Sequence, residues 1–172
     1  MSGGEPCLCR GLPDIITEIK KLALPVKLDT NGMFPEMLEK LFGREGTRPD
    51  YIALDLKVAP ARYAELIPEK TRNDLCEKLI KSAALIRSSG ISHEYRTLAL
   101  PGGYISTEDI EVLAHLADNA PWYFRPFVGG NCLDPAWDIL EEPVAEARAR
   151  LEALAGRARE LGKAGKVMGI GE

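Results

Sequence analysis

The sequence predicts an α/β protein in which helices pack outside a parallel sheet. Three observations support this prediction. Short apolar runs alternate along the chain with longer stretches whose apolar residues recur at helical spacing. The expected order is an opening loop, then helix and strand in alternation, and finally a helix, which is typical of parallel sheets. The run at residues 51–56 is almost continuously apolar, as expected for a strand buried on both faces.

The first half of the chain supplies two helices and two strands, each bounded by residues that interrupt regular structure. Pro13 suits the first turn of a helix, and Pro25 ends that helix. Asn31-Gly32 closes the strand that follows, and Pro35 opens the second helix. The expected elements are a helix over residues 12–22, a strand at 26–30, a helix at 35–42 and a strand at 51–56.

The second half repeats this alternation twice and adds a last helix. Ser106 is a good N-cap, with Asp109 in the reciprocal position of a capping box. No repeat or linker is visible, so we expect one domain with its core at about residues 1–140 and a loose, glycine-rich tail at 162–172. The expected elements are a helix over 75–86, a strand at 94–100, a helix at 106–117, a strand at 122–127 and a C-terminal helix at 143–161.

The composition excludes several classes of protein. A chain of 172 residues is long enough for one real core, and 45% hydrophobic with 28% charged residues is typical of a globular protein. A net charge of -4 offers no basic surface for nucleic acid. No apolar run is long enough to span a membrane, and no signal peptide is visible. We therefore expect a cytoplasmic protein.

The four cysteines are a weak signal for a metal site. Disulfides are not expected without export. Cys76 lies on the apolar side of its helix and is expected to be a small buried hydrophobe. Cys7 and Cys9 form a C-x-C, whereas zinc and iron–sulfur sites usually show C-x-x-C-type spacing with further partners. The residues alone therefore predict no metal site.

Three polar stretches are expected to line one pocket, because ligands of parallel α/β folds bind at the carboxyl ends of the strands. The paired glycines of the first stretch let the backbone approach a ligand closely, since they have no Cβ. The polar residues of the other two directly follow apolar runs. The stretches are Gly3-Gly4-Glu5, Asp29-Thr30-Asn31 and Asp55-Leu56-Lys57.

The charged residues at two of the expected strand ends allow two interpretations each. Asp55 and Lys57 are two residues apart and face the same side of a strand. Together they suit a zwitterion, with one gripping its ammonium and the other its carboxylate. On their own, however, they are better explained as a structural ion pair. Arg96 either reaches the pocket or pairs at the rim, and the two outcomes have equal weight.

The remaining charged and histidine residues carry weaker expectations. Arg125 interrupts an aromatic run and needs a partner if it is buried. Glu5 and Asp29 are candidates for the same cluster. His93 lies just before a strand and His115 within a helix, so both are expected to be solvated or structural.

Taken together, these motifs resemble the radical S-adenosylmethionine (SAM) superfamily, and especially the activating enzymes of anaerobic ribonucleoside-triphosphate reductases. The resemblance covers nearly the whole chain up to the last helix. It implies the C-terminal part of a partial TIM barrel, an incomplete parallel (β/α) barrel of about four strands with outer helices. The motifs are Ser-Gly-Gly-Glu-Pro at 2–6, Val-Lys-Leu-Asp-Thr-Asn-Gly at 26–32, Tyr-Ile-Ala-Leu-Asp-Leu-Lys at 51–57, Tyr95-Arg96 leading to Leu100-Pro101-Gly102, and Phe124-Arg125-Pro126 followed by Cys132-Leu133-Asp134-Pro135.

The resemblance also implies a set of SAM-binding residues. In this family the Gly-Gly-Glu stretch holds the amino group of the methionine part of SAM, and the two later stretches help to bind the same cofactor. An arginine in a similar strand matches Arg96. The residues implied here are Gly3, Gly4, Glu5, Asp29, Thr30, Asn31, Asp55, Lys57 and Arg96.

One motif of the family is missing. The family binds a [4Fe–4S] cluster through C-x-x-x-C-x-x-C ahead of the Gly-Gly-Glu loop, and this chain has no such motif. Two strands are expected to be absent before Met1, so the cluster is expected only with a further N-terminal segment. Cys7 and Cys9 follow the loop at the wrong spacing to replace it. Without the cluster, reductive cleavage of SAM has no electron source.

Two functions follow from the resemblance. The first is a radical SAM activating enzyme, which cleaves SAM reductively so that a deoxyadenosyl radical takes hydrogen from a glycine of its partner. That partner is a glycyl-radical enzyme, expected to be anaerobic ribonucleoside-triphosphate reductase, and this chain alone is expected to be inactive. The alternative is a non-catalytic, cluster-free binding or interaction module. The absent strands also predict an unpaired edge on strand 26–30 that leads to self-association, and a poorly held Glu5.

Overall fold

One parallel sheet organises the part of the chain that the computed structural model describes, which is residues 1–2, 4–66, 74–128 and 142–169. The strands lie in the order of the sequence, and every neighbouring pair is parallel. The strands are β1 (Lys27–Thr30), β2 (Tyr51–Asp55), β3 (Ser92–Ala99), β4 (Pro121–Pro126) and β5 (Ala164–Val167). The predicted α/β class with a parallel sheet is therefore confirmed, with five strands in place of about four.

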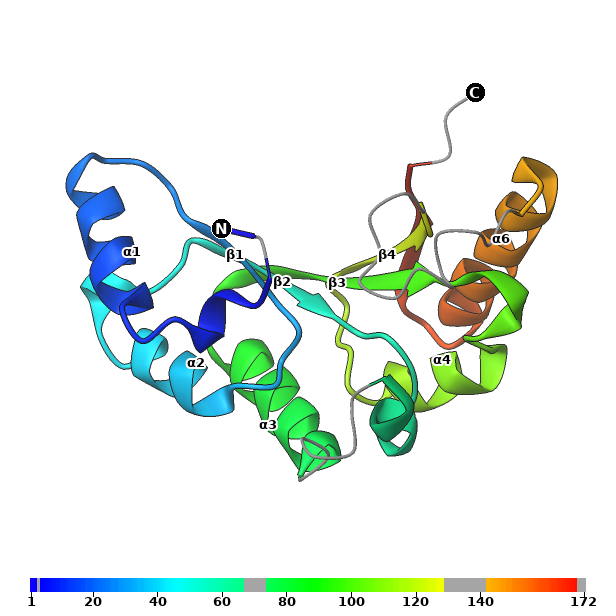
Figure 1. Ribbon diagram of the computed structural model, residues 1–172, viewed down its shortest axis with the longest axis horizontal. Helices are drawn as coiled ribbons and strands as arrows, with labels where there is room; N and C mark the ends of the chain where they lie inside the picture. Colours follow the sequence, from blue (N-terminus) through cyan, green and yellow to red (C-terminus); the bar gives the residue numbers. More distant parts are fainter. Residues whose placement is uncertain (3, 67–73, 129–141, 170–172) are drawn as a thin grey trace.

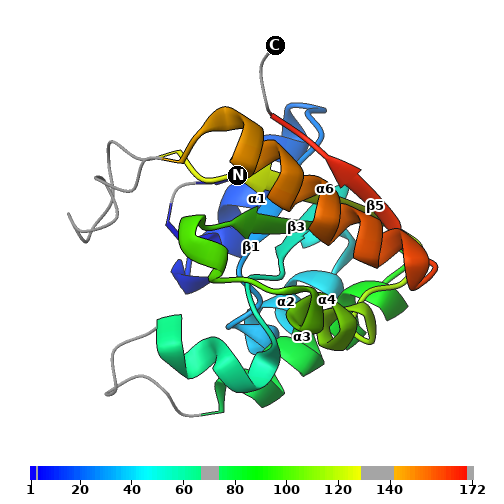
Figure 2. The ribbon, with the colours of Figure 1, turned by 90° about the vertical axis from the view of Figure 1, so that its right-hand side faces the viewer.

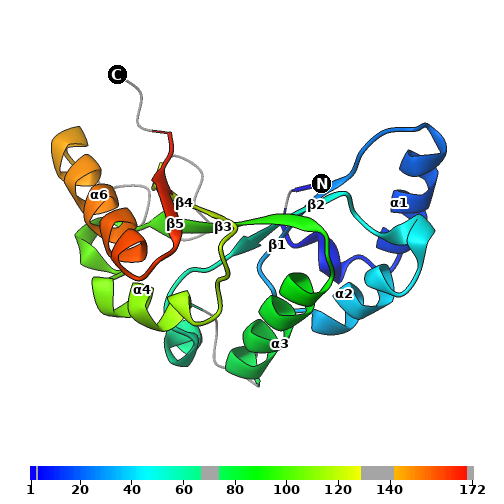
Figure 3. The same cartoon turned by 180° about the vertical axis from the view of Figure 1, so that it is seen from behind.

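The helices cover one face of this sheet (Figures 1 and 3). The α-helices are α1 (Leu12–Lys21), α2 (Pro35–Phe42), α3 (Leu75–Ser88), α4 (Thr107–Ala114) and α6 (Val144–Glu160). Short 3-10 turns connect them, at η1 (Pro6–Leu8), η2 (Glu45–Thr47), η3 (Pro60–Leu66) and η5 (Pro101–Gly103). The predicted capping box of Ser106 and Asp109 starts α4. No described helix is long and apolar enough to cross a membrane.

The hydrophobic core lies between the sheet and these helices. Alternate strand residues point into it, because successive side chains of a strand point to opposite faces. Trp122 and Phe124 of β4 stack with ring centroids 5.2 Å apart. The indole N–H of Trp122 donates to Thr97 Oγ1 at 2.9 Å, and Thr97 Oγ1 donates to the Leu56 carbonyl at 2.6 Å. The polar groups buried there are thus satisfied within the core.

The opposite face of the sheet, here called the open face, is covered by none of the described helices (Figure 1). Charged side chains lie on it. Lys27 of β1 pairs with Glu94 of β3 at 2.8 Å, and Arg96 of β3 pairs with Asp29 of β1 at 2.8 Å. Both ion pairs pass over β2, whose residue at that level is the small, fully buried Ala53.

Strand β5 corrects the prediction that residues 162–172 form a loose tail. Gly162 has φ +76°, which suits the end of α6, and β5 then pairs with β4 along its length. A Cβ on Gly165 would lie 2.6 Å from the Ala155 carbonyl oxygen. Strand β5 lies against α6 (Figure 2). Glycine at position 165 is what allows this close approach. The same glycines hide the strand in the sequence, because glycine is rare in strands.

The outer edge of β1 is partly occupied by the start of the chain. The Met1 amino group donates to the Lys27 carbonyl, and the Met1 carbonyl accepts from the Asp29 N–H at 3.0 Å. These two bonds are the pattern of a parallel strand opposite Leu28. β1 is the end strand of the described sheet, as predicted, but its edge is not wholly unpaired.

Candidate functional site

A polar pocket of about 120 Å³ lies at the carboxyl ends of β1 and β2, beside Arg96 in the middle of β3. It brings together residues from all three polar stretches singled out in the sequence. Gly3 lies outside the described residues, and Ser2 of the motif at 2–6 joins the set although it is not among the predicted binding residues. The residues that line this polar pocket are Ser2, Gly4, Glu5, Asp29, Thr30, Asn31, Asp55, Lys57 and Arg96.

Arg96 links two of the pocket's carboxylates. Its Nε and Nη2 lie 3.0 and 2.9 Å from Asp55 Oδ1, and its Nη1 lies 2.8 Å from Asp29 Oδ2. Burial lowers the pKa of the Arg96 guanidinium, but the two carboxylates outweigh burial and hold it above its ordinary value. Both interpretations of Arg96 are therefore partly right, since it reaches the pocket and is also paired there.

Glu5 is held firmly, in contrast to the prediction from the sequence. Its Oε1 accepts from the Cys7 N–H at 3.0 Å and from Thr30 Oγ1 at 2.9 Å. Its Oε2 accepts from the Asn31 N–H at 2.6 Å. The end of β1 therefore positions the loop that carries Glu5. Thr30 and Asn31 at the end of β1 supply two of the three bonds, and together the three use most of the acceptor capacity of the carboxylate.

The turn after β1 is fixed by its own side chains. Thr30 Oγ1 accepts from the Gly32 N–H at 3.1 Å, and Asn31 Oδ1 accepts from the Met33 N–H at 2.9 Å. Gly32 has φ +76°, and a Cβ there would lie 2.9 Å from Leu54 Cδ1. Thr30 and Asn31 thus shape the pocket wall, and Gly32 is required by both backbone conformation and space.

Lys57 is the cation of the polar pocket whose ammonium group donates no hydrogen bond to a described residue. Its Nζ lies 3.8 Å from Asp55 Oδ2, longer than a hydrogen bond, and its side chain is 43% exposed. The structural ion pair of Asp55 and Lys57 is therefore present at 3.8 Å, but Asp55 pairs more closely with Arg96, at 2.9 Å. The Lys57 N–H is held by the buried Tyr63, whose Oη accepts from it at 3.0 Å. No pattern in the sequence singles out Tyr63.

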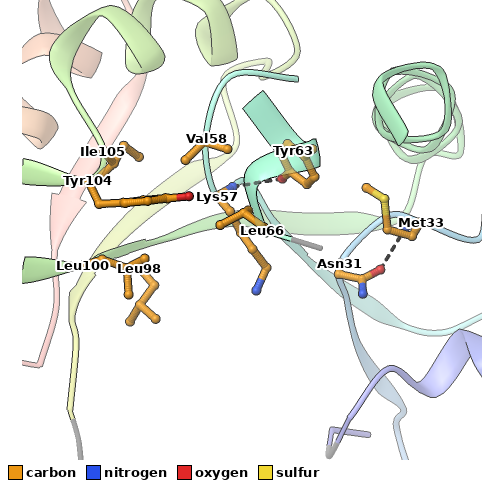
Figure 4. Close-up of a pocket in the computed structure, with 10 residues that line it drawn as sticks. All are labelled: Asn31, Met33, Lys57, Val58, Tyr63, Leu66, Leu98, Leu100, Tyr104 and Ile105. Carbon is orange, nitrogen blue, oxygen red and sulfur yellow. Dashed lines mark hydrogen bonds between the residues drawn. The ribbon is translucent and has the colours of Figure 1, made fainter. Parts of the chain in front are cut away.

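An apolar cavity of about 340 Å³ adjoins the polar pocket, since Asn31 and Lys57 line both. Figure 4 shows the Lys57 side chain between Leu98 and Tyr104 on one side and Asn31 and Met33 on the other. Most of its other walls are aliphatic or aromatic. They are Val58, Tyr63, Leu66, Leu100 and Ile105.

The described residues contain no group of three or more His, Cys, Asp or Glu placed to hold a metal ion. Cys7 is buried, and burial raises the pKa of its thiol to about 12, so it stays protonated at neutral pH. Cys9 is exposed, and Cys76 is only half-buried, less than predicted. Cys132 lies outside the described residues. These residues do not fit a [4Fe–4S] cluster.

Other residues singled out in the sequence lie away from the polar pocket. Arg125 is exposed and does not join Glu5 or Asp29, because it lies on β4, two strands from β2. His93 Nε2 lies 3.2 Å from the Asp118 carboxylate near the start of β3, which is a structural contact. His115 is exposed at the end of α4. The motif at 132–135 lies outside the described residues.

The side chains of the polar pocket carry one more negative than positive charge. Glu5, Asp29 and Asp55 carry three negative charges against the two positive charges of Lys57 and Arg96, which leaves one negative charge. Asp29 Oδ1 is buried without a hydrogen-bond partner. A buried oxygen of this kind is costly unless a donor reaches it. The site therefore suits a small polar ligand with a cationic end.

The fold is that of radical SAM enzymes. SuiB of Streptococcus suis, solved with S-adenosylmethionine bound, matches 97% of this chain and 38% of its own with a TM-score of 0.62 and 13% identity. A radical SAM methyltransferase of Sphaerobacter thermophilus matches 87% of this chain and 43% of its own, with a TM-score of 0.62 and 19% identity. The predicted partial barrel is thereby confirmed.

Among curated proteins, the chain is 31% identical over 174 residues to the "Putative glycyl-radical enzyme activating enzyme MJ1227" of Methanocaldococcus jannaschii. The match covers 96% of this chain and 65% of that protein, so the chain spans slightly less than two thirds of its relative. No model of a protein family matches. The predicted resemblance to radical SAM activating enzymes is confirmed by these comparisons.

Proposed function

We propose that this chain binds SAM in its polar pocket and forms the cofactor- and partner-binding part of an activating enzyme for a glycyl-radical enzyme. One observation carries the proposal. The three stretches that resemble SAM-binding motifs converge on a single pocket, and Asp29, Asp55 and Arg96 are joined there directly. Similarity to the M. jannaschii protein supports the kind of partner.

Charge favours SAM as the ligand. At neutral pH SAM carries an ammonium, a sulfonium and a carboxylate, a net charge of +1, which offsets the single negative charge of the pocket. Asp55 Oδ2 and Lys57 Nζ lie 3.8 Å apart and neither forms a close ion pair with the other. They suit the ammonium and the carboxylate of one amino acid. Glu5, Asn31 and Thr30 shape the wall beside them.

The purine end of SAM would enter the adjoining apolar cavity. That cavity is about 340 Å³ in volume, and Tyr63 and Tyr104 give it aromatic walls. Ligand pockets usually combine such apolar walls with a few placed polar groups. The polar pocket and the apolar cavity share Lys57 and Asn31, so one molecule with a charged and a flat end can occupy both.

The proposed role of this chain is to bind and orient the cofactor rather than to reduce it. SAM, when reductively cleaved, supplies a deoxyadenosyl radical that takes hydrogen from a glycine. The described residues do not fit the cluster that provides the electron, so the donor must lie outside them. Anaerobic ribonucleoside-triphosphate reductase is the proposed partner, and cytoplasm the proposed location.

Calorimetric titration with SAM and with S-adenosylhomocysteine tests the binding proposal. S-adenosylhomocysteine has no sulfonium charge, so we expect it to bind more weakly. Asp55→Asn should weaken SAM binding about tenfold, as expected for loss of a charge-assisted contact. Glu18→Gln, which removes an exposed carboxylate on α1, should not.

Circular dichroism establishes that each variant is folded. A folded chain that binds neither compound, or binds both equally, would contradict the proposal. Binding without a glycyl-radical signal in electron paramagnetic resonance, when the reductase, a cluster-bearing segment and a reductant are supplied, would favour the alternative of a non-catalytic binding module.

A further inference from the structure

A second recess opens on the same carboxyl edge of the sheet, one strand beyond the polar pocket. It is a shallow groove of about 470 Å³, here called the Arg125 groove, lined by Leu98, Arg125, Pro126, Phe127, Val128 and Met168 together with Gly169. Leu98 and Arg125 are opposite each other in the pairing of β3 with β4. Met168 follows β5, and its N–H donates to the Phe124 carbonyl at 2.9 Å.

Arg125 has guanidinium N–H groups that no described carboxylate or carbonyl accepts. Its contact within the described residues is to the Met168 sulfur, 3.1 Å from Nη2, and a thioether is a weak acceptor. Arg96, Arg150 and Arg157, by contrast, each pair with a carboxylate. A guanidinium has five N–H donors in a fork that fits a carboxylate. The Arg125 guanidinium in this groove therefore suits an anion such as a carboxylate.

The walls of the groove favour an apolar neighbour beside that anion. Leu98 is 41% exposed, Val128 82% and Met168 36%. Arg125 is the one charged side chain among the lining residues, so the groove is positive where the polar pocket is negative. The chemistry that complements it is an acidic side chain next to an aliphatic one.

The spacing of residues along β3 indicates where an acidic side chain bound in the groove would lie relative to the polar pocket. Arg96, in the polar pocket, and Leu98, in the groove, lie two residues apart on the open face, which is roughly 7 Å along a strand. A polypeptide segment that anchors an acidic side chain in the groove therefore brings residues two or three positions away toward the polar pocket.

We propose that the Arg125 groove binds a segment of the partner polypeptide that carries an acidic residue beside an aliphatic one. The Arg125 guanidinium takes the carboxylate, while Leu98, Val128 and Met168 take the aliphatic side chain. This rests on the proposed function, in which a protein is the substrate. The groove then selects the partner and sets the position of its chain relative to the cofactor.

Titration of the full 172-residue chain with two dipeptides tests this proposal. The probes are acetyl-Leu-Glu-N-methylamide and acetyl-Leu-Gln-N-methylamide, and the readout is the NMR shift of the Met168 and Leu98 methyl groups. We expect the Glu probe to bind about tenfold more tightly than the Gln probe. Arg125→Gln should abolish that difference. Lys166→Gln, which removes a neighbouring cation of β5 that lies over Tyr123, should leave it.

Two outcomes would overturn the proposal. One is equal binding, or no binding, of the Glu and Gln probes by the folded chain. The other is that inorganic phosphate, or acetyl-Glu-N-methylamide without leucine, shifts the same methyl signals as strongly, because the groove would then be a general anion site. A separate SAM titration, read at the Asn31 and Gly32 amides, reports on the proposed function independently.

Discussion

The polar pocket depends on a residue that lies behind it. Tyr63 is 2% exposed, its Oη accepts from the Lys57 N–H at 3.0 Å, and it lies 3.4 Å from the Asp55 carbonyl. Burial raises the pKa of Tyr63 above its ordinary value, so the phenol is neutral at physiological pH. Tyr63 therefore fixes the backbone from which Asp55 and Lys57 reach into the polar pocket.

Replacing Tyr63 with Phe should lower the free energy of unfolding by about 1 to 2 kcal/mol, because the Lys57 N–H loses its partner. The ratio of SAM to S-adenosylhomocysteine affinity should also fall, since Lys57 is no longer held beside Asp55. Urea unfolding and calorimetry measure the two effects. Tyr123→Phe, at a phenol without a side-chain hydrogen bond among the described residues, should change neither. A variant that loses stability but keeps the ratio would assign Tyr63 a purely structural role.

The packing of α6 against β5 is a contact between elements that a single substitution can disrupt. Gly165 lies where a Cβ would meet the Ala155 carbonyl oxygen at 2.6 Å and the Ala158 Cβ at 3.0 Å. Backbone atoms cannot move aside as the end of a side chain can. The approach of α6 to the sheet is therefore set by one missing methyl group.

Gly165→Ala should destabilise the chain by roughly 1–3 kcal/mol, as overpacking does in a filled core. Gly46→Ala is the matched control, because no atom lies within 4 Å of the added methyl there. Its effect should stay within about 0.5 kcal/mol. Both are measured by urea unfolding. If the two variants unfold alike, β5 does not pack on α6.

Most of the helices and strands could be predicted from the sequence, because their apolar residues recur at regular spacing. It predicted four strands and five helices to within a few residues, and it placed Asp29, Asp55 and Lys57 at one edge. It missed β5 because Ala164-Gly165-Lys166-Val167 has little strand propensity. It also missed Tyr63, since nothing in a local pattern shows that a distant hydroxyl reaches the Lys57 amide. The aromatic residues around Arg125 in sequence left its burial open, and Arg125 is exposed.

At the scale of the whole molecule, apolar side chains gather at the β1 end. Leu8, Ile15, Leu22 and Leu24 are 64%, 43%, 70% and 54% exposed, and they lie in α1 or within four residues of it in the sequence. Helix α1 lies at this end of the sheet (Figure 1). β1 is the end strand, with Met1 bonded to part of its outer edge. An apolar surface beside a strand edge is a template for association.

We therefore predict that the chain associates in a concentration-dependent way, and that Leu22→Lys with Leu24→Lys shifts it toward monomer. Sedimentation velocity measures the distribution. Val112→Lys is the control, because Val112 is 46% exposed on α4, away from β1. A monomer at all concentrations, or an equal effect of Val112→Lys, would show that association does not involve the β1 end.

The two ion pairs that pass over Ala53 have a mechanical consequence. They tie β1 to β3, roughly 9.5 Å apart, so they resist flattening of the sheet between them. Curvature in turn sets the lateral distance from the Asp29 side of the sheet to the Arg125 side. The protein thus sets the width of the open face before a ligand binds. Binding therefore does not have to offset the entropy lost in ordering that face. Ala53→Leu would place a larger side chain beneath the two ion pairs, push them apart and increase the lateral distance from the Asp29 side to the Arg125 side.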